Sequence, residues 1–274
     1  MALVSVQLPA DVVEGRVSQD KLSADACMSV SAPSASKPLE VPLMPAQHNM
    51  QARKVSVWEW QGMGLDEGYE AARWFSGVLG FDCRLVRYVG KSRMPSAAYL
   101  PAFAGLDGQI TTRPTDPDYA AGFETSFADD FPILLVSEED LSDLNVHLQQ
   151  RGAPPVTMAR FRPNLVMKGG SAWAEDTCRT VSVQTVDNGS VELTSVKPCS
   201  RCKVPTIDPE TAEAGDEPLD TLHTFRNGGS LGWSKKSWKH AVFFGTNLVV
   251  PPEACGHLLH AGDHVEMSGT QVPW

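Results

Sequence analysis

The sequence predicts a mixed, mainly β fold: an antiparallel barrel or sandwich flanked by a few helices. Three observations favour this fold class. Short apolar runs separated by turn residues fill the second half of the chain, only two segments have helical apolar spacing, and no internal repeat is visible. With 274 residues, 42% of them hydrophobic, the chain can build one large domain or two small ones around a buried core.

The first half of the chain contains one clear strand-helix-strand pattern. Residues 54–60 have the composition of a strand, residues 66–79 carry apolar side chains at helical spacing, and residues 84–88 are typical of a second strand. Gly80 stands where a glycine commonly ends a helix. Residues 3–8 also resemble a strand, but the Ser-, Ala- and Pro-rich stretch that comes later has few core residues.

The glycine-rich stretch at residues 62–68 lies between a predicted strand and a predicted helix, as a dinucleotide-binding loop would. Its glycine spacing is one residue too long. Asp66 and Glu67 also occupy the expected helix N-terminus, where their charges would repel a pyrophosphate. We interpret these two acidic residues as partners of the helix dipole.

The second half of the chain alternates between strands and turns. After a loop over residues 104–128, residues 132–136 form an apolar run, and Ser137 with Asp140 has the form of a capping box that opens a helix to about Gln150. Beyond that helix we expect mainly strands, at residues 165–167, 181–186, 191–196, 204–207, 242–244, 248–250 and 265–267.

The charge of the chain argues against a nucleic-acid partner. Its 33 acidic and 23 basic residues give a formal net charge of −10, which opposes binding to a phosphate backbone. No run approaches the roughly 18 apolar residues of a membrane-spanning helix, and the first residues do not resemble a secretory signal, so we expect an intracellular chain without a transmembrane segment. We interpret one basic segment as a solvated loop or a docking patch for an acidic partner: Trp233, Lys235, Lys236, Trp238, Lys239 and His240.

The stretch Cys199-Ser200-Arg201-Cys202 is the strongest candidate for chemistry. Three interpretations of this CxxC stand beside a plain pair of buried cysteines. A zinc site would need further ligands, for which Cys255 with His257 or His260 are the candidates. A redox dithiol would need its first cysteine at a helix N-terminus. In the third interpretation, a single thiolate binds a transition metal while neighbouring bases hold an anionic cofactor.

A second string with the same character is Arg160-Phe161-Arg162-Pro163-Asn164. The guanidinium of Arg162 suits planar, bidentate capture of a phosphate or carboxylate, and a rigid proline follows it. The side chain of Asn164 offers both a donor and an acceptor. This string therefore predicts an anion-binding element.

Taken together, these strings resemble the MOSC domain, in the form found in the plant and algal amidoxime-reducing component family. The similarity rests on RFRPN (160–164), CSRCKVPTIDPETA (199–212) and FFGTNLVV (243–250), with upstream support from VWEWQGMGLDEGYEAARWFSGVLG. It implies a MOSC β-barrel with a few flanking helices, preceded by a truncated α+β N-terminal subdomain. The expected segments are a remnant and linker, a strand-helix-strand unit and the MOSC domain, at residues 1–53, 54–103 and 104–270.

The resemblance also implies a cofactor and the residues that hold it. The family binds molybdenum in a molybdopterin cofactor, and the second cysteine of the CSRC motif, which is Cys202 in this sequence, is the implied metal ligand and catalytic residue. The implied cofactor contacts are Asp129, Arg162, Asn164, Ser200, Arg201 and Asn247.

The activity implied by the resemblance is the two-electron reduction of N-hydroxylated substrates such as amidoximes and hydroxylamines. The electrons would come from a cytochrome b5-type haem protein, itself reduced by an NADH-dependent flavoprotein. The alternative is a molybdenum cofactor carrier or sulfur-transfer module, because a MOSC domain also terminates the cofactor sulfurases. Those proteins carry a pyridoxal phosphate-binding domain, for which 274 residues leave no room. Family members are often mitochondrial or cytosolic.

The start of the sequence departs from the family pattern. The family normally opens with a strand carrying a YP-x-KS motif and with basic residues for the pterin phosphate. No basic residue precedes Arg16 in this sequence. We therefore expect the chain as given to bind the cofactor weakly.

Overall fold

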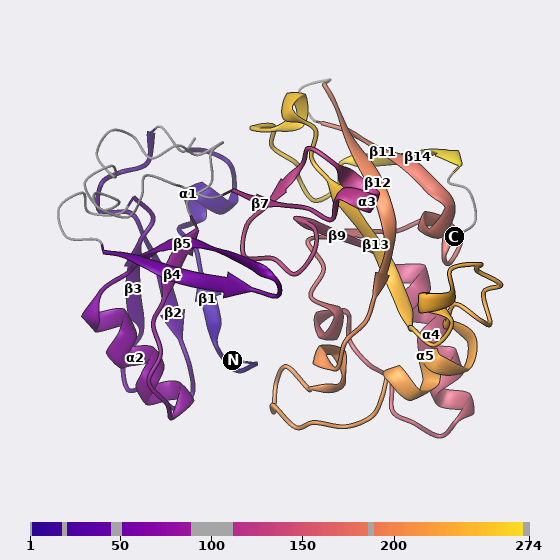
Figure 1. Ribbon diagram of the computed structural model, residues 1–274, viewed down its shortest axis with the longest axis horizontal. Helices are drawn as coiled ribbons and strands as arrows, with labels where there is room; N and C mark the ends of the chain where they lie inside the picture. The colour runs from indigo at the N-terminus through magenta and orange to yellow at the C-terminus, as the bar shows by residue number, and fades with distance from the viewer. Residues whose placement is uncertain (1, 18–20, 45–50, 89–111, 186–188, 271–274) are drawn as a thin grey trace. The chain divides into compact units, whose positions relative to one another are not determined.

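The computed structural model describes residues 2–17, 21–44, 51–88, 112–185 and 189–270 (Figure 1). The chain divides into two compact units, Leu3–Arg113 and Pro114–Trp274, and each unit has its own apolar core. The domain boundary expected between residues 103 and 104 lies outside the described residues. Within the described ranges, no helix is both long and apolar enough to cross a lipid bilayer.

The first unit contains two three-stranded antiparallel sheets, with the strand orders β1-β2-β3 and β4-β5-β6. A one-turn helix, α1 (Ala10–Val13), follows the first strand. The bounds of the six strands, in chain order, are Ser5–Gln7, Cys27–Ser31, Leu39–Pro42, Ala52–Val57, Trp60–Asp66 and Val86–Tyr88.

Helix α2 (Tyr69–Leu79) covers the core of this unit. Its side chains Ala71 and Phe75, four positions apart, lie on one face of the helix and pack against three buried residues of the β1-β2-β3 sheet. Gly80 ends the helix in the left-handed conformation, with a φ of 79°, as predicted.

The region before α2 differs from the prediction. The single strand expected at residues 54–60 is a hairpin of two strands, and most of the glycine-rich stretch lies within β5. Asp66 is 4% exposed and pairs with Arg53 and Arg84; burial would raise its pKa, but these partners hold the pKa below its ordinary value. Glu67 forms an ion pair of 2.6 Å with a third arginine. Both acidic residues thus neutralise arginines. Asp66 also contacts the N-terminus of α2, which begins at Tyr69, because it accepts a hydrogen bond of 2.8 Å from the backbone N–H of Gly68, the residue that precedes the helix.

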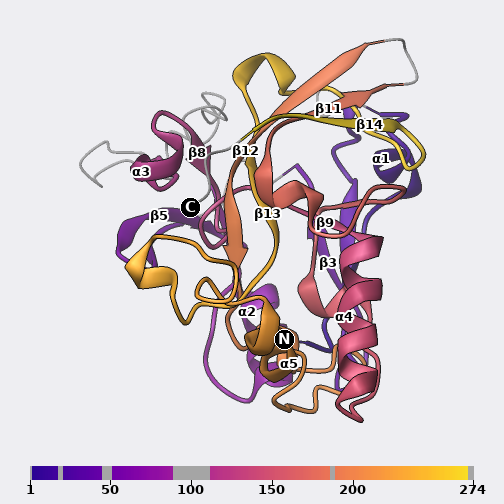
Figure 2. The ribbon, with the colours of Figure 1, turned by 90° about the vertical axis from the view of Figure 1, so that its right-hand side faces the viewer.

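The second unit is built on one six-stranded sheet with the order β10-β9-β13-β12-β11-β14 (Figures 1 and 2). Only β9 and β10 are parallel. The sheet curls into a half-barrel, so the prediction of a mainly β fold with few helices is confirmed. The bounds of β9 to β14, in chain order, are Ile133–Ser137, Leu165–Met167, Cys178–Gln184, Ser190–Ser200, Phe243–Val249 and His264–Thr270.

Smaller elements complete this unit. The two-residue strands β7 (Arg113–Pro114) and β8 (Glu124–Thr125) pair with each other, and the one-turn helix α3 (Pro117–Ala120) lies between them in the chain. They form where the sequence predicts a long loop, because runs of two to four residues leave no periodic signal.

Two helices pack on one face of the six-stranded sheet. Helix α4 (Glu138–Gln150) begins as predicted, because the Ser137 hydroxyl accepts a hydrogen bond of 3.0 Å from the backbone N–H of Asp140. Helix α5 (Leu219–Phe225) is not predicted by the apolar pattern, since seven residues span only two turns. Both helices contribute leucines to one core that includes Val136 of β9.

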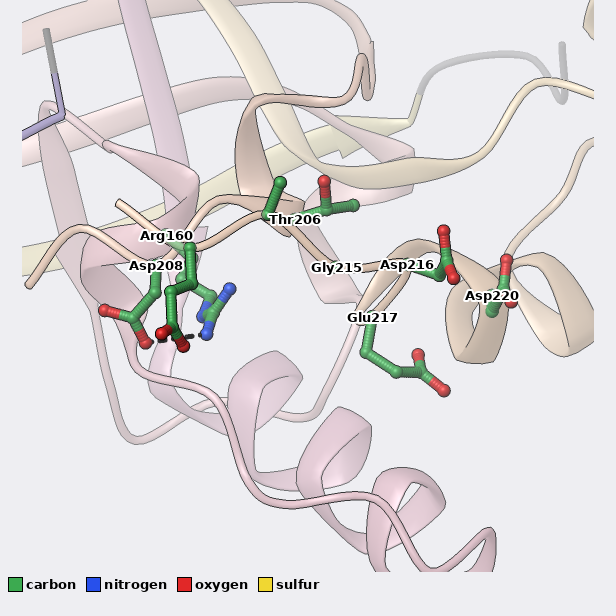
Figure 3. Close-up of a pocket in the computed structure, with 9 residues that line it drawn as sticks. Arg160, Thr206, Asp208, Gly215, Asp216, Glu217 and Asp220 are labelled. Atoms are coloured by element: carbon green, nitrogen blue, oxygen red, sulfur yellow. Dashed lines mark hydrogen bonds and ion pairs between the residues drawn. The ribbon is translucent and has the colours of Figure 1, made fainter. Parts of the chain in front are cut away.

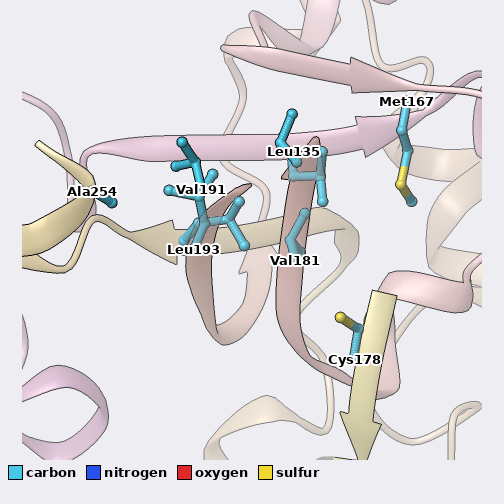
Figure 4. Packing of buried hydrophobic residues seen from close by; sticks show 9 residues of the cluster. Leu135, Met167, Cys178, Val181, Val191, Leu193 and Ala254 are labelled. Atoms are coloured by element: carbon cyan, nitrogen blue, oxygen red, sulfur yellow. The ribbon is translucent and has the colours of Figure 1, made fainter. Parts of the chain in front are cut away.

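The opposite face of the sheet carries a second apolar core (Figure 4). Successive side chains of a strand point to opposite faces, so β9 places Leu135 in this core and Val136 in the core under the helices. The buried members of this second core are Leu135, Met167, Cys178, Val181, Val183, Val191, Leu193, Leu248 and Ala254.

Strand β13 is longer than predicted. The two short strands expected at residues 242–244 and 248–250 form one continuous strand, and the Gly-Thr pair between them is not a turn. Gly245 has a φ of 73°, and a Cβ at this position would lie 2.6 Å from the backbone oxygen of Leu135 on β9. Glycine is thus required for β13 to pass close to its neighbour.

Four titratable residues of the second unit form a cluster, and three of them are buried. Asp140 and Glu175 have no exposed surface, and Arg226, which is 3% exposed, forms an ion pair of 2.8 Å with Asp176 and lies 4.0 Å from the ring centre of Trp173. Burial, together with the neighbouring Asp140 carboxylate, raises the pKa of Glu175 to about 10. Glu175 therefore retains its proton in the folded protein near neutral pH.

Replacing Glu175 with glutamine should stabilise the protein increasingly as pH rises. Between the ordinary value of 4.5 and about 10, the unfolded chain has released a proton that folded Glu175 retains. Rising pH therefore disfavours the wild-type fold by up to about 1.4 kcal/mol per pH unit, and the glutamine variant lacks this effect. Urea unfolding at several pH values measures the difference. Glu138→Gln, which removes an exposed carboxylate at the start of α4, is the control. Parallel pH curves for wild type and the Glu175 variant would contradict the raised pKa of Glu175.

Candidate functional site

A cavity of about 310 Å³ opens in the second unit, at the ends of β9, β12 and β13. Turns that follow β12 and precede β10 complete its wall. All seven residues that the sequence nominated for the site line this cavity: Asp129, Arg162, Asn164, Ser200, Arg201, Cys202 and Asn247. The fold thus brings together side chains that are far apart in the chain, from Asp129 to Asn247.

The CSRC motif reaches the cavity because the pairing of β12 with β13 is irregular. Pro198 pairs with Thr246 and Ser200 pairs with Phe243, so Cys199 alone stands opposite two residues of β13. After Ser200 the strand ends and the chain turns. A strand is expected at residues 204–207, but Val204–Thr206 form a short 3-10 turn, because the proline within it cannot donate to a strand ladder.

The two cysteines of the motif have different surroundings. Cys199 is half-buried; burial raises the pKa of its thiol, although the Arg201 guanidinium, with Nη1 at 3.1 Å from Sγ, acts in the opposite direction. Cys202 is exposed in the turn and lines the cavity. The two thiols are free, and Cys202 is the accessible one.

The zinc interpretation finds no support in the described part of the chain. A structural zinc site needs four ligands close together. No group of three or more histidine, cysteine, aspartate or glutamate side chains in the described ranges is placed to hold a metal ion. Cys255 is also exposed and free, and it does not line the cavity.

Two arginines line the cavity, and only one of them is fixed by the protein. Arg201 donates through Nη2 to the backbone oxygen of Phe161 at 3.0 Å, in addition to its contact with Cys199. Arg162 is exposed and has a left-handed backbone with a φ of 54°. Among the described residues no carboxylate forms an ion pair with Arg162, so its guanidinium is available to an anionic ligand.

The position of Arg162 depends on the residue before it. Phe161 is 1% exposed and stacks on Phe244 of β13, with 3.7 Å between ring centres. This stack anchors the 3-10 turn Met158–Phe161 against the sheet, so Arg162 emerges at the cavity. Phe161 thus positions Arg162.

Two asparagines supply neutral polar groups. The side-chain oxygen of Asn164 accepts a hydrogen bond of 2.8 Å from the backbone N–H of Leu134, and its own backbone N–H donates to the Leu134 oxygen at 3.0 Å. The Asn164 side-chain NH2 remains as a donor. Asn247 is 7% exposed and pairs with Leu134 and Lys197 on the neighbouring strands, and its amide lies in the cavity wall.

The cavity also contains carboxylates. Asp129 and Asp130 both line it, and Asp130 forms an ion pair of 3.2 Å with Lys197 of β12. The Lys197 ammonium also lies 4.7 Å from the ring centre of Tyr119 and 5.1 Å from that of Phe131. Lys197 is not among the residues that the sequence nominated for the site. Its position two residues before Cys199 on β12 could have indicated it, because strand residues two positions apart lie on one face.

A second cavity of about 480 Å³ lies nearby in the fold and has a different character (Figure 3). Arg160, from the same string as Arg162, points into it and forms an ion pair of 2.9 Å with Asp208. The other charged side chains around it are acidic: Glu213, Asp216, Glu217 and Asp220. The two arginines of RFRPN therefore have different surroundings. Arg160 has a carboxylate partner, whereas Arg162 has none among the described residues.

Comparison with known proteins identifies the family. The model of the MOSC domain matches residues 123–266, and the model of the MOSC N-terminal beta barrel domain matches residues 12–82. The chain belongs to the MOSC domain family. The resemblance stated from the CSRC and RFRPN strings is thus confirmed, and these strings lie within the matched MOSC domain.

Named relatives refine this assignment. The MOSC protein is 33% identical over 194 residues to the mitochondrial amidoxime-reducing component 1 of Mus musculus, covering 69% of this chain and 49% of that protein. It is 35% identical over 167 residues to the mitochondrial amidoxime reducing component 2 of Rattus norvegicus, covering 60% and 42%. It is also 30% identical over 164 residues to the molybdenum cofactor sulfurase of Arabidopsis thaliana, covering 56% and 18%. The chain spans about half the length, or less, of these relatives.

The two cysteines of the motif should react with iodoacetamide at different rates. Cys202 is exposed, whereas the Cys199 thiol is half-buried with a raised pKa, so near neutral pH Cys202 should be alkylated first by about tenfold or more. Quenched time points analysed by peptide mass spectrometry measure both rates, with exposed Cys255 as the internal reference. Equal rates, or faster labelling of Cys199, would contradict the described environments.

Proposed function

We propose that this MOSC protein binds a molybdenum–molybdopterin cofactor in the 310 Å³ cavity and reduces N-hydroxylated compounds. One observation carries the proposal: the exposed thiol of Cys202 lines the same cavity as the guanidinium of Arg162, for which the described residues provide no carboxylate partner. Similarity to amidoxime-reducing components and to a molybdenum cofactor sulfurase supports a function related to this cofactor.

The chemistry of the lining residues fits such a ligand. A molybdopterin cofactor combines a soft metal centre, a ring rich in N–H groups and a phosphate. The cavity offers a thiolate donor in Cys202, a guanidinium for the phosphate in Arg162, and carboxylate and amide groups for the ring in Asp129 and Asn247. A purely anionic ligand would be repelled by the carboxylates, and a purely cationic one by the arginines.

Each lining residue has a proposed part in the reaction. The cofactor supplies the two-electron reduction and the removal of the substrate oxygen. Cys202, whose thiol is exposed and lines the cavity, would hold the metal. Arg162 and Ser200 bind the phosphate-bearing part, and Arg201 keeps the CSRC turn attached to the Phe161 backbone. Asn164 and Asn247 orient the ring through their amides.

The overall reaction determines which substrate, electrons and protons must reach the site. A hydroxylamine R–NH–OH takes up two electrons and two protons, its N–O bond breaks, and R–NH2 and water leave. An amidoxime is converted to an amidine by the same balance. A one-electron haem protein of the cytochrome b5 type, re-reduced by an NADH-dependent reductase, must therefore deliver electrons twice for each turnover.

A second candidate function is that of a cofactor carrier or sulfur-transfer module. Similarity to the Arabidopsis thaliana molybdenum cofactor sulfurase favours it. The aligned part covers 18% of that longer protein. Both functions need the same cavity, and turnover separates them. A carrier would hold molybdenum without reducing benzamidoxime, whereas a reductase would do both.

Cys202→Ala should abolish benzamidoxime reduction, and Cys199→Ala should retain most of it. Loss of groups that merely support a metal ligand typically costs about 10- to 100-fold, and loss of the ligand itself should cost more. The assay uses cofactor-loaded protein with reduced cytochrome b5, and molybdenum and zinc are quantified in each variant by elemental analysis. The matched Cys199 variant controls for general disturbance of the turn. Greater loss in Cys199→Ala than in Cys202→Ala would overturn the ligand assignment.

A further inference from the structure

A basic patch stands on the surface of the second unit of this acidic protein. We define it as Lys235, Lys236, Lys239 and His240, all of which are exposed. The full chain carries a formal net charge of −10, yet this segment of six residues contains three lysines and no acidic residue. Within the described ranges, none of these lysines forms an ion pair with a carboxylate. Their charge is therefore available to a partner.

The patch rests on a packed aromatic base. Trp233 and Trp238 contact each other, and both contact Phe243 at the start of β13, with ring centres 4.7 Å and 5.2 Å away. Phe243 has no exposed surface. Tyr119 stacks on Trp238 with an interplanar angle of 10°. The tryptophans thus point inward, and the lysines project from a fixed platform.

The patch adjoins the cavity that holds Cys202. The Lys235 ammonium lies 4.4 Å from the ring centre of Tyr119, and the Lys197 ammonium lies 4.7 Å from the same ring centre. Lys197 in turn pairs with Asp130 in the cavity wall. The backbone gives a second link, since Phe243 pairs directly with Ser200 of the CSRC motif.

The composition of the patch distinguishes among anionic partners. A membrane-binding surface normally inserts exposed apolar side chains, and none of the exposed large hydrophobic residues of the described chain lies in residues 226–243. A duplex nucleic acid would meet strong repulsion from the rest of an acidic protein. An acidic protein surface of limited area can contact the patch alone, and such electrostatic contacts suit fast, transient docking.

We propose that the basic patch docks the acidic face of the one-electron haem protein that reduces the site in the adjoining cavity. This inference rests on the proposed reductase function. In each encounter the haem iron passes from ferrous to ferric and gives up one electron, so two dockings supply the two electrons that cleave the N–O bond, with two protons from solvent. A patch beside the cavity shortens the path of each electron and lets the oxidised donor leave quickly.

The double variant Lys236→Glu with Lys239→Glu tests the patch. These two lysines are chosen because Lys235 contacts Tyr119. The control is Lys168→Glu with Arg179→Glu, which makes the same change of charge at exposed positions outside the cavity lining. The probe is a soluble, acidic cytochrome b5 haem domain, and its Kd is measured by calorimetry at low and at about 0.15 M ionic strength.

The patch variant should raise the Kd by about tenfold or more at low ionic strength and should flatten its salt dependence, while the control variant changes it much less. Equal Kd values for the two variants would overturn the docking proposal. Patch-dependent binding of anionic vesicles or duplex DNA, without binding of the haem domain, would overturn the choice of partner.

Turnover of benzamidoxime with a small chemical reductant separates this inference from the proposed function. A patch variant that loses turnover with the haem protein but keeps it with the chemical reductant supports docking. Wild-type protein that holds molybdenum but turns over with neither donor refutes the reductase function. A patch variant that turns over like wild type with the haem protein refutes docking and leaves the reductase function standing.

Discussion

The pairing of β12 with β13 is the constraint on which the site depends. Its irregularity at Cys199 releases the chain from the sheet just before Cys202, so that one thiol is held against the strand and the other is exposed. The same pair of strands sets Asn247 opposite Lys197 and Ser200 opposite Phe243. The pairing therefore fixes the cavity wall and the base of the basic patch together, and a change of register would displace both.

Gly245 makes this pairing possible. Strand β13 lies between β9 and β12, and the close approach of the Leu135 backbone leaves no room for a Cβ at Gly245. At the preceding position of the same strand, the stack of Phe161 on Phe244 attaches the turn that carries Arg162. Gly245 and Phe244 do not line the cavity, yet together with Phe161 they determine where the Cys202 thiol and the Arg162 guanidinium lie relative to each other.

The net charge of −10 does not describe how charged side chains are distributed in this protein. Asp66, Asp176 and Asp208 each neutralise arginines, and Glu175 is kept protonated by burial. These pairings leave Arg162 and the lysines of the basic patch as cations without carboxylate partners in the described structure. An acidic chain can therefore present two arginines in the cavity wall and a cationic surface close by, because many of its acidic side chains are neutralised within the fold or dispersed over the surface.

The sequence by itself determined the mainly β class, the Ser137 cap and the glycine stop at Gly80, and it nominated seven residues that line one cavity. These depend on short-range patterns and on motif strings that survive without knowledge of contacts. Only the tertiary structure decided that Asp66 pairs with Arg53 and Arg84 and that Val204–Thr206 form a 3-10 turn. It alone decided that Arg160 has a carboxylate partner while Arg162 has none among the described residues. It also decided that the basic patch adjoins the cavity. Each of these facts depends on which distant residue is a neighbour, and burial and pairing with distant partners leave no trace in local composition.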